Sequence, residues 1–311
     1  MAELESGDVP LFPDLSAERA ALAHARASRA AMIDRYERML RDGNGAADDI
    51  TGEYIEVTLV RALEDLAPED AADFFGRIDT DAGERFRIGR RHIEDGQHEP
   101  VVVDWRAPVA APFYRATLQD PFGLRLRRRY SLKSGELIGY NDEHLDNPSG
   151  DEAVGGIPDP VLAEIGAART GAMREIVATI QAEQDLVIRS PIDQTLVVQG
   201  GPGTGKTAVG LHRAAYLLFE HRFRLMREGV LVVGPNRVFL DYIAGVLPSL
   251  GERYVEQRAV PDLVLPRLEV GGTDTPEATA LKGDARWVTV VERAARARLR
   301  PPQDDMVIPH G

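Results

Sequence analysis

The sequence predicts an α/β protein made of an N-terminal helical hairpin, a small β-rich module and a final domain built on a parallel sheet. Apolar residues recur at helical spacing in two runs between residues 16 and 66. Short β-type runs alternate with turn signals between residues 74 and 140. From residue 195 onward, apolar runs that are typical of buried strands alternate with helical segments, which indicates a parallel sheet.

The composition excludes several classes of site. The chain has 311 residues, enough for about two domains, and it contains no cysteine. Disulfides, thiolate catalysis and cysteine-bound zinc are therefore excluded. The sequence shows no basic-then-apolar leader and no apolar run of about eighteen residues, so we expect a cytoplasmic protein that does not bind a membrane.

Acidic residues are concentrated near the N-terminus. The first 80 residues carry 18 Asp and Glu against 8 Arg and no Lys, within a net charge of −13 for the chain. This balance argues against DNA binding by this part, since such binding depends on neutralising phosphates. It suits contact with a basic protein surface, and a solvated acidic face is the alternative.

The helical hairpin occupies residues 1–73. One helix is expected from about Ser16 to Arg41 and a second from Gly52 to Leu66, with a glycine turn between them. Each has a mostly apolar stripe on one side. The two helices either pack on a core or project as an arm, and the pattern is compatible with both.

The β-rich module spans residues 74–145, and we expect a small antiparallel sheet or a barrel-like fold. The expected strands are residues 86–89, 101–103, 113–114 and 130–132. A basic cluster follows, made of Arg125, Arg127, Arg128 and Arg129. It is either a patch for phosphate or an acidic protein, or a strand edge with solvated arginines.

The run from Val101 to Asp104 resembles a Mg²⁺-binding strand, because nucleotide motors hold Mg²⁺ with an apolar strand that ends in an acid. It continues into Trp105-Arg106-Ala107-Pro108, and we interpret it as a structural corner. Residues 146–190 are expected to be a linker followed by helices that reach about Arg189 and break near Thr170.

The last predicted domain spans residues 191–311. We expect a buried strand at Thr195–Val198, a helix at Ala208–Phe219 and a second buried strand at Val230–Val233. A helix to about Leu247, weak strands after residue 249 and a final helix from Val288 to Leu299 complete the pattern.

The segment between the first strand and its helix matches the phosphate-loop pattern G-x-x-x-x-G-K-[ST]. Glycines let successive backbone N–H groups point at one phosphate, and the helix adds its positive N-terminal end. We expect Lys206 to contact the β- and γ-phosphates of a bound nucleotide and the Thr207 hydroxyl to bind Mg²⁺. The expected nucleotide-binding residues are Gly200, Gly201, Pro202, Gly203, Thr204, Gly205, Lys206 and Thr207. The plainer alternative is a glycine-rich turn that binds nothing.

Longer stretches of the chain resemble the HelD family, which are bacterial UvrD-like superfamily 1 motor proteins that bind RNA polymerase. The matching segments are FFGRID (74–79), RIGR (87–90), VVVDWRAPVAAPFYRAT (101–117), the arginine run to Arg129, MREIVATIQAEQDLVIRSP (173–191), GLHRAAYLLF (210–219) and VVGPNRVFLDYIAGVLPSLGE (232–252). The segment around DWRAP, together with the phosphate loop, makes the resemblance specific.

The resemblance implies that the helical hairpin enters the secondary channel of RNA polymerase and that ATP hydrolysis in RecA-like domains releases the polymerase. It implies that Gln184 contacts adenine, with Gln181 as the competitor for that role. Asn236 lies in a segment that touches DNA in true helicases, and here we expect it to be mainly structural. ATP, Mg²⁺ and core RNA polymerase are therefore the expected ligands and partner, and DNA is a less favoured partner.

The sequence departs from the family pattern after the phosphate loop. No apolar strand ending in Asp-Glu follows Thr207, and the second motor domain is not recognisable. We therefore expect a truncated RecA-like domain in an N-terminal part of a longer protein, with the catalytic residues for hydrolysis unknown. The alternatives are a fragment of a UvrD-like DNA helicase or translocase, and an inactive remnant.

Overall fold

A computed structural model of the chain describes residues 12–42, 49–67, 72–146, 176–253, 255–263 and 272–298. The chain divides into two compact units, one ending at Pro261 and the other beginning at Asp262. Each unit is described by itself. The mixed α/β class predicted from the sequence is confirmed. The linker and the helices expected between residues 147 and 175 lie outside the described residues.

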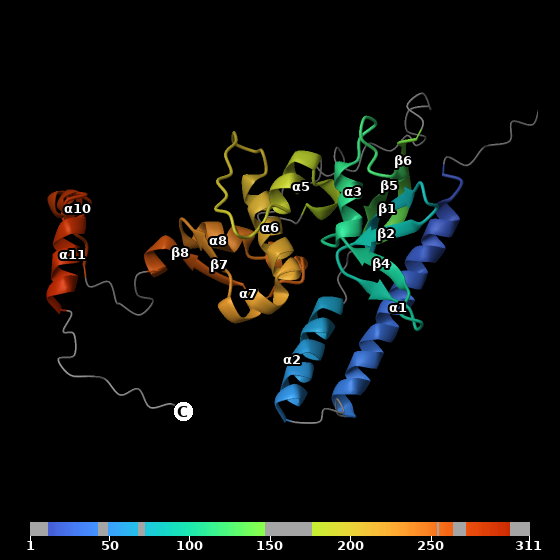
Figure 1. Cartoon of the computed structure of the whole chain (residues 1–311), viewed down its shortest axis with the longest axis horizontal. Helices are drawn as coiled ribbons and strands as arrows, with labels where there is room; N and C mark the ends of the chain where they lie inside the picture. Colours follow the sequence, from blue (N-terminus) through green and yellow to red (C-terminus); the bar gives the residue numbers. More distant parts are fainter. Residues whose placement is uncertain are drawn as a thin grey trace, which may run out of the picture. The chain divides into compact units, whose positions relative to one another are not determined.

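The helical hairpin forms as predicted. Helix α1 spans Leu15–Arg41 and helix α2 spans Asp49–Leu66, and the two helices pack on each other (Figure 1). The buried stripe of α1 includes Leu22, Ala25 and Met32, which pack against a β-sheet. The N-terminal part of the hairpin is therefore anchored on a core.

The sheet of the β-rich module has six strands in the order β3-β4-β2-β1-β5-β6. The strands are β1 (Phe74–Thr80), β2 (Arg85–Gly89), β3 (Ile93–Glu94), β4 (Pro100–Asp104), β5 (Leu124–Lys133) and β6 (Glu136–His144). Neighbours are antiparallel except β2 and β4, which run parallel, so the sheet is mixed rather than purely antiparallel. Successive residues face opposite layers: Phe74 packs towards α1, while Phe75 packs towards the helices that follow the sheet.

One expected strand is a helix. Residues 113–114 lie in α3 (Ala111–Arg115), which follows the short 3-10 helix η1 (Pro108–Ala110). Pro108 and Pro112 occupy first-turn positions, where a missing N–H costs nothing and the fixed φ favours the helix. The Phe113 ring lies over Gly76, where a Cβ would come within 2.2 Å of it. Pro108 and Pro112, which fall among the turn signals expected in this region, therefore lie in the first turns of helices.

Two of the four arginines of the cluster are buried, while Arg125 is exposed and Arg129 is half-buried. Arg127 and Arg128 are 6% and 2% exposed, and both point into the module. Arg127 donates to Glu143 at 2.6 Å, and Arg128 donates to Asp142 at 2.6 Å. Both expectations for these two residues, a binding patch and a solvated edge, are wrong, because carboxylates on the neighbouring strand pair with them.

The rest of the first unit consists of short helices around a two-stranded parallel sheet. Its elements are η2 (Val177–Thr179), α5 (Ala182–Ile188), α6 (Lys206–Glu220), α7 (Arg222–Glu228), β7 (Leu231–Gly234), α8 (Arg237–Ile243), α9 (Val246–Ser249) and β8 (Glu256–Ala259), and the 3-10 helix η3 (Val260–Leu263) spans the boundary between the units. Strands β7 and β8 pair in parallel. The predicted helix after residue 207 and the predicted strand at 230–233 are therefore present, and Asn236 caps α8 by accepting from Phe239 N at 2.9 Å.

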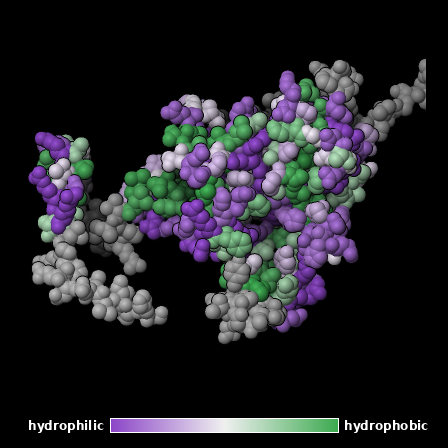
Figure 2. Space-filling view, viewed as in Figure 1, coloured by the Kyte–Doolittle hydropathy of each residue, from purple (hydrophilic) through white to green (hydrophobic). Residues whose placement is uncertain are grey.

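The strand expected at Thr195–Val198 does not form. These residues have no regular structure, and Val197 is 77% exposed. A lone strand needs a neighbour for its backbone groups, and the described part of β7 pairs with β8 alone. Strand β7 is also more exposed than predicted, and exposed hydrophobic residues gather over β7 and α8 (Figure 2).

The second unit contains two described helices. They are α10 (Pro276–Lys282) and α11 (Trp287–Arg298), and only α11 was expected from the sequence. Thr275 caps α10 by accepting from Ala278 N at 3.3 Å. Within the described ranges, no helix of either unit is long and apolar enough to span a membrane.

Candidate functional site

The glycine-rich loop leads directly into helix α6, as the motif requires. Gly205 is the N-cap residue of α6, and Lys206 and Thr207 begin its first turn. Gly203 and Gly205 have φ values of 79° and 81°, a left-handed conformation that side chains disfavour. Gly200 cannot carry a side chain for a different reason, since a Cβ there would lie 2.7 Å from the Thr204 hydroxyl oxygen. The three glycines therefore make this bend possible.

The lysine of the motif lies across the loop. Its Nζ donates to the backbone carbonyls of Gly200 at 2.9 Å and Gly201 at 2.6 Å. Thr204 donates to the same Gly201 carbonyl at 3.0 Å. Pro202 and the residues around it are exposed, while Lys206 and Thr207 are half-buried. An ammonium group thus lies at the mouth of an exposed bend at a helix N-terminus, which suits an anion.

Helix α5 brings Gln184 to this loop. The Nε2 atom of Gln184 lies 3.1 Å from the position that a Cβ of Gly205 would occupy. Its Oε1 accepts from the backbone N–H of Gln181 at 3.0 Å. The two glutamines that compete for the base-reading role therefore differ in place. Gln184 adjoins the phosphate loop, while Gln181 precedes the helix and is exposed.

The residue after Gln184 is a buried carboxylate that sequence reasoning did not single out. Asp185 is fully buried and accepts from Arg115 of α3 at 2.5 Å and from Arg189 at 2.8 Å. Arg189 also donates to the backbone carbonyls of Trp105 at 2.6 Å and Arg106 at 2.8 Å. Two arginines thus join α5 to the β-rich module.

The segment after β4 is the structural corner that we expected. Asp104 accepts from the guanidinium of Arg106 at 2.7 Å, and Arg106 also donates to Glu252 at 2.7 Å. The Arg106 guanidinium lies 4.8 Å from the ring centroid of Phe219 on α6. Burial by itself would lower the pKa of Arg106, but the carboxylates of Asp104 and Glu252 outweigh burial and raise it.

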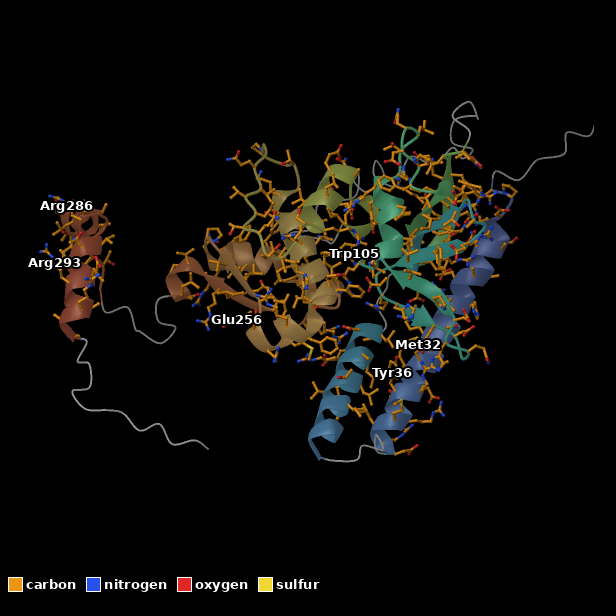
Figure 3. All side chains as sticks on the ribbon, viewed as in Figure 1. Met32, Tyr36, Trp105, Glu256, Arg286 and Arg293 are labelled. Carbon is orange, nitrogen blue, oxygen red and sulfur yellow. The ribbon has the colours of Figure 1, made fainter. Side chains whose placement is uncertain are left out.

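Trp105 fills the space between the sheet and α6 (Figure 3). Its ring meets the ring of His212 edge-on, with centroids 5.8 Å apart. His212 is fully buried: its Nδ1 lies 2.7 Å from the Ala208 carbonyl, and its Nε2 accepts from Ile176 N at 3.2 Å. The pair of hydrogen bonds fits a neutral imidazole with a structural role. In the sequence, only the position of His212 on the apolar side of the predicted helix could have indicated this structural role.

A cavity of about 130 Å³ adjoins the corner, between α2 and the helices α6 and α7. Asp65, Arg106, Phe219, Arg222 and Glu252 are among its lining residues. Burial raises the pKa of Asp65 and of Glu252, and nearby arginines act in the opposite direction. This polar cavity could not be predicted from local patterns, because its lining residues come from four separate segments.

Glu18 of α1 is a second buried carboxylate that sequence reasoning missed. It is 2% exposed and accepts from Tyr130 at 2.7 Å, from Arg128 at 2.9 Å and from Arg87 at 3.2 Å, with a further short contact from Arg77. In the sequence, the position of Glu18 on the apolar stripe of the first helix could have indicated that it is buried. Among the described residues, no group of three or more His, Cys, Asp or Glu forms a metal site.

Comparison with known families assigns the first part of the chain. Residues 15–154 match the family model described as DNA helicase IV HelD, N-terminal domain. The N-terminal portion of this chain is HelD-like. The match covers both helices of the hairpin and all six strands of the mixed sheet, while Gln184 and the glycine-rich loop follow it in the sequence. No protein with a curated description matches the chain significantly.

Proposed function

We propose that this HelD-like chain binds ATP with Mg²⁺ at the loop from Gly200 to Thr207, in a RecA-like domain, and binds RNA polymerase through its N-terminal domain. The observation that carries the nucleotide site is the position of Lys206, which crosses the bend at the start of α6. Gln184 beside Gly205 gives this site a group that can read a base. In complete family proteins, the resemblance implies that ATP hydrolysis serves to release the polymerase.

The residues present fit a triphosphate. The positive φ values of Gly203 and Gly205 let loop N–H groups turn to one side, and the start of α6 adds a partial positive charge. Lys206 would exchange its two carbonyl partners for phosphate oxygens, and the Thr207 hydroxyl would hold Mg²⁺. The bound metal would neutralise the charge that the phosphates bring together.

The charge of the N-terminal region supports the polymerase partner. The acidic N-terminal region includes Asp34, Glu37 and Glu56, which are exposed on α1 and α2. The two helices carry eight acids against seven arginines, so most of the excess negative charge of the first 80 residues lies outside them. An acid-rich region can be steered towards a basic channel by long-range attraction. The RNA polymerase partner is what the HelD resemblance implies, and the hairpin is the element that would contact it.

The nucleotide site is tested by Lys206→Ala. We expect this change to remove binding of ATP and Mg²⁺, measured by equilibrium competition against a fluorescent ATP analogue, and to leave the circular dichroism spectrum unchanged. ATP should also raise the melting temperature of the wild type and not that of the variant, because a ligand stabilises the state that binds it. Lys282→Ala is the matched control, since Lys282, at the end of α10, is an exposed lysine that pairs with Asp274. ATP affinity that survives Lys206→Ala would contradict the proposal.

DNA binding is the second candidate, since the matched family description names a DNA helicase. It predicts ATPase activity that single-stranded DNA stimulates and binding that weakens steeply with salt. Competition between DNA and core RNA polymerase for the full chain distinguishes the two candidates. Binding of DNA, with none of polymerase, would favour the helicase function.

A further inference from the structure

The short helix that carries Gln184 is held in place by the N-terminal domain. Helix α5 has seven residues and packs between α3 and α6. Gln184 lies beside the phosphate loop, and the next residue, Asp185, is fully buried. A helix this short has little stability of its own, so its position depends on its tertiary contacts.

Two arginines connect α5 to the HelD-like domain, and they do so differently. Arg189 belongs to the end of α5 and donates to the carbonyls of Trp105 and Arg106. Arg115 comes from α3, inside the matched domain, and its Nε reaches the Asp185 carboxylate at 2.5 Å. Without Arg115, the link through Arg189 would remain, and Asp185 would keep one arginine partner in its own helix. The helix would stay attached but would lose one of its two anchors.

We propose that Arg115 positions Gln184 through Asp185, so that the HelD-like domain sets the base preference of the nucleotide site. A glutamine amide can recognise adenine by accepting from the exocyclic N6–H and donating to N7, whereas guanine presents an oxygen in place of that amine. Both contacts need the amide in a defined place. This inference rests on the proposed nucleotide site and adds a positioning residue from outside it.

The test compares three ligands on the full-length chain, each with Mg²⁺: ATP, GTP and inorganic tripolyphosphate. We expect Arg115→Gln to weaken ATP binding at least about tenfold, since even one well-placed hydrogen bond is worth that much, and to leave binding of GTP and tripolyphosphate unchanged. Gln184→Ala should give the same loss, and the double variant should lose no more, because both changes remove one interaction. A purely structural role for Arg115 would weaken all three ligands together.

Arg35→Gln is the matched control. Arg35 also pairs with a carboxylate, that of Glu94, and its side chain is 28% exposed against 26% for Arg115. It lies on α1, away from α5, so its replacement should leave the ratio of ATP to GTP affinity unchanged. Should circular dichroism show that Arg115→Gln is unfolded, Arg115→Lys takes its place, with a smaller loss for ATP alone.

Three outcomes overturn the inference. They are an unchanged ratio of ATP to GTP affinity in the Arg115 variants, an equal loss for all three ligands, and additive losses in the double variant. If tripolyphosphate binding depends on Lys206 but the ratio of ATP to GTP affinity does not depend on Arg115, this inference is refuted and the proposed nucleotide site is not. Absence of tripolyphosphate binding by the wild type refutes the proposed nucleotide site, and this inference falls with it.

Discussion

Replacing Glu18 by glutamine would remove the charge that fastens α1 to the sheet. The Glu18 carboxylate accepts from Tyr130 and from three arginines of the sheet, and it is 2% exposed. Glutamine keeps the shape of the side chain but has a single acceptor oxygen and no charge. The arginines around it would then face a neutral amide in a site that water does not reach.

The structure sets the size of the effect. Arg77 would keep Asp79 at 2.8 Å, and Arg128 would keep Asp142 at 2.6 Å. Arg87 would lose its contact with Glu18 and be left over the ring of Phe74. A charge-assisted hydrogen bond is worth about 1.5–3 kcal/mol, and breaking a buried ion pair costs about 3–5 kcal/mol. Because two of the three arginines keep a carboxylate, we expect a loss of about 3 kcal/mol in the free energy of unfolding.

The assay is urea unfolding of the full chain in a Trp287→Phe background. The sequence has two tryptophans, and this change leaves buried Trp105 as the fluorescent reporter of the first unit. Glu136→Gln is the control, since Glu136 pairs with Arg26 of the same helix at an exposed site, where a pair is worth about 1 kcal/mol or less. A Glu18→Gln loss no larger than that of the control would refute the reasoning.

The same variant gives a pH dependence. Burial by itself would raise the pKa of Glu18, but the Tyr130 hydroxyl and the three arginines outweigh it and lower the pKa below its ordinary value of 4.5. A lowered pKa in the folded state contributes stability that is present above about pH 4.5 and is lost as the pH falls through the folded-state pKa. The difference in stability between wild type and Glu18→Gln should therefore be full at pH 7 and shrink below pH 4.5.

Two further predictions concern the hairpin and the sheet. Replacing Asp34, Glu37 and Glu56 by lysine should weaken binding to core RNA polymerase about tenfold at low salt and less at high salt. Pull-down or interferometry measures this affinity. Unchanged affinity would exclude the hairpin as a charged contact. Gly89→Ala should lower the free energy of unfolding by about 2–3 kcal/mol, because its Cβ would lie 2.1 Å from the Asp73 carbonyl, while Gly96→Ala, with open space around it, should stay within about 0.5 kcal/mol in the same urea assay.

Local patterns predicted the helices well. The stripe of α1, the second helix of the hairpin and the helix after the phosphate loop all form within a few residues of the expected bounds. Helical periodicity records which side of one continuous segment is buried, so a single sequence carries it. The bend at Gly203 and Gly205 was predictable for the same reason, since a positive φ is a property of the local backbone.

Strands were predicted less well, because a strand exists only beside another one. The run from Thr195 to Val198 has the composition of a buried strand, yet it is irregular and exposed. The run at 113–114 has β-type residues, but prolines in the first turns of η1 and α3 place it in a helix. Strand β6 was not predicted, and it forms because β5 pairs with it over eight residue pairs.

Which charged side chains are buried was decided by tertiary structure alone. In the sequence, Arg127 and Arg128 resemble a surface patch, Asp185 is one of many acids, and Glu18 is an ordinary first-turn residue of a helix. Each is buried because a partner distant in the chain neutralises it: Glu143 and Asp142 for the two arginines, Arg115 for Asp185, and the sheet arginines for Glu18.

The sequence by itself determined the hairpin, the bend at the start of α6 and the resemblance of residues 15–154 to the HelD N-terminal domain, since these depend on short-range pattern. Only the folded chain decided that Gln184 adjoins Gly205 and that Arg115 reaches across from α3 to the residue beside it. Burying a charge is unfavourable unless an opposite charge meets it, and which charges meet depends on how segments separated by some seventy residues pack together.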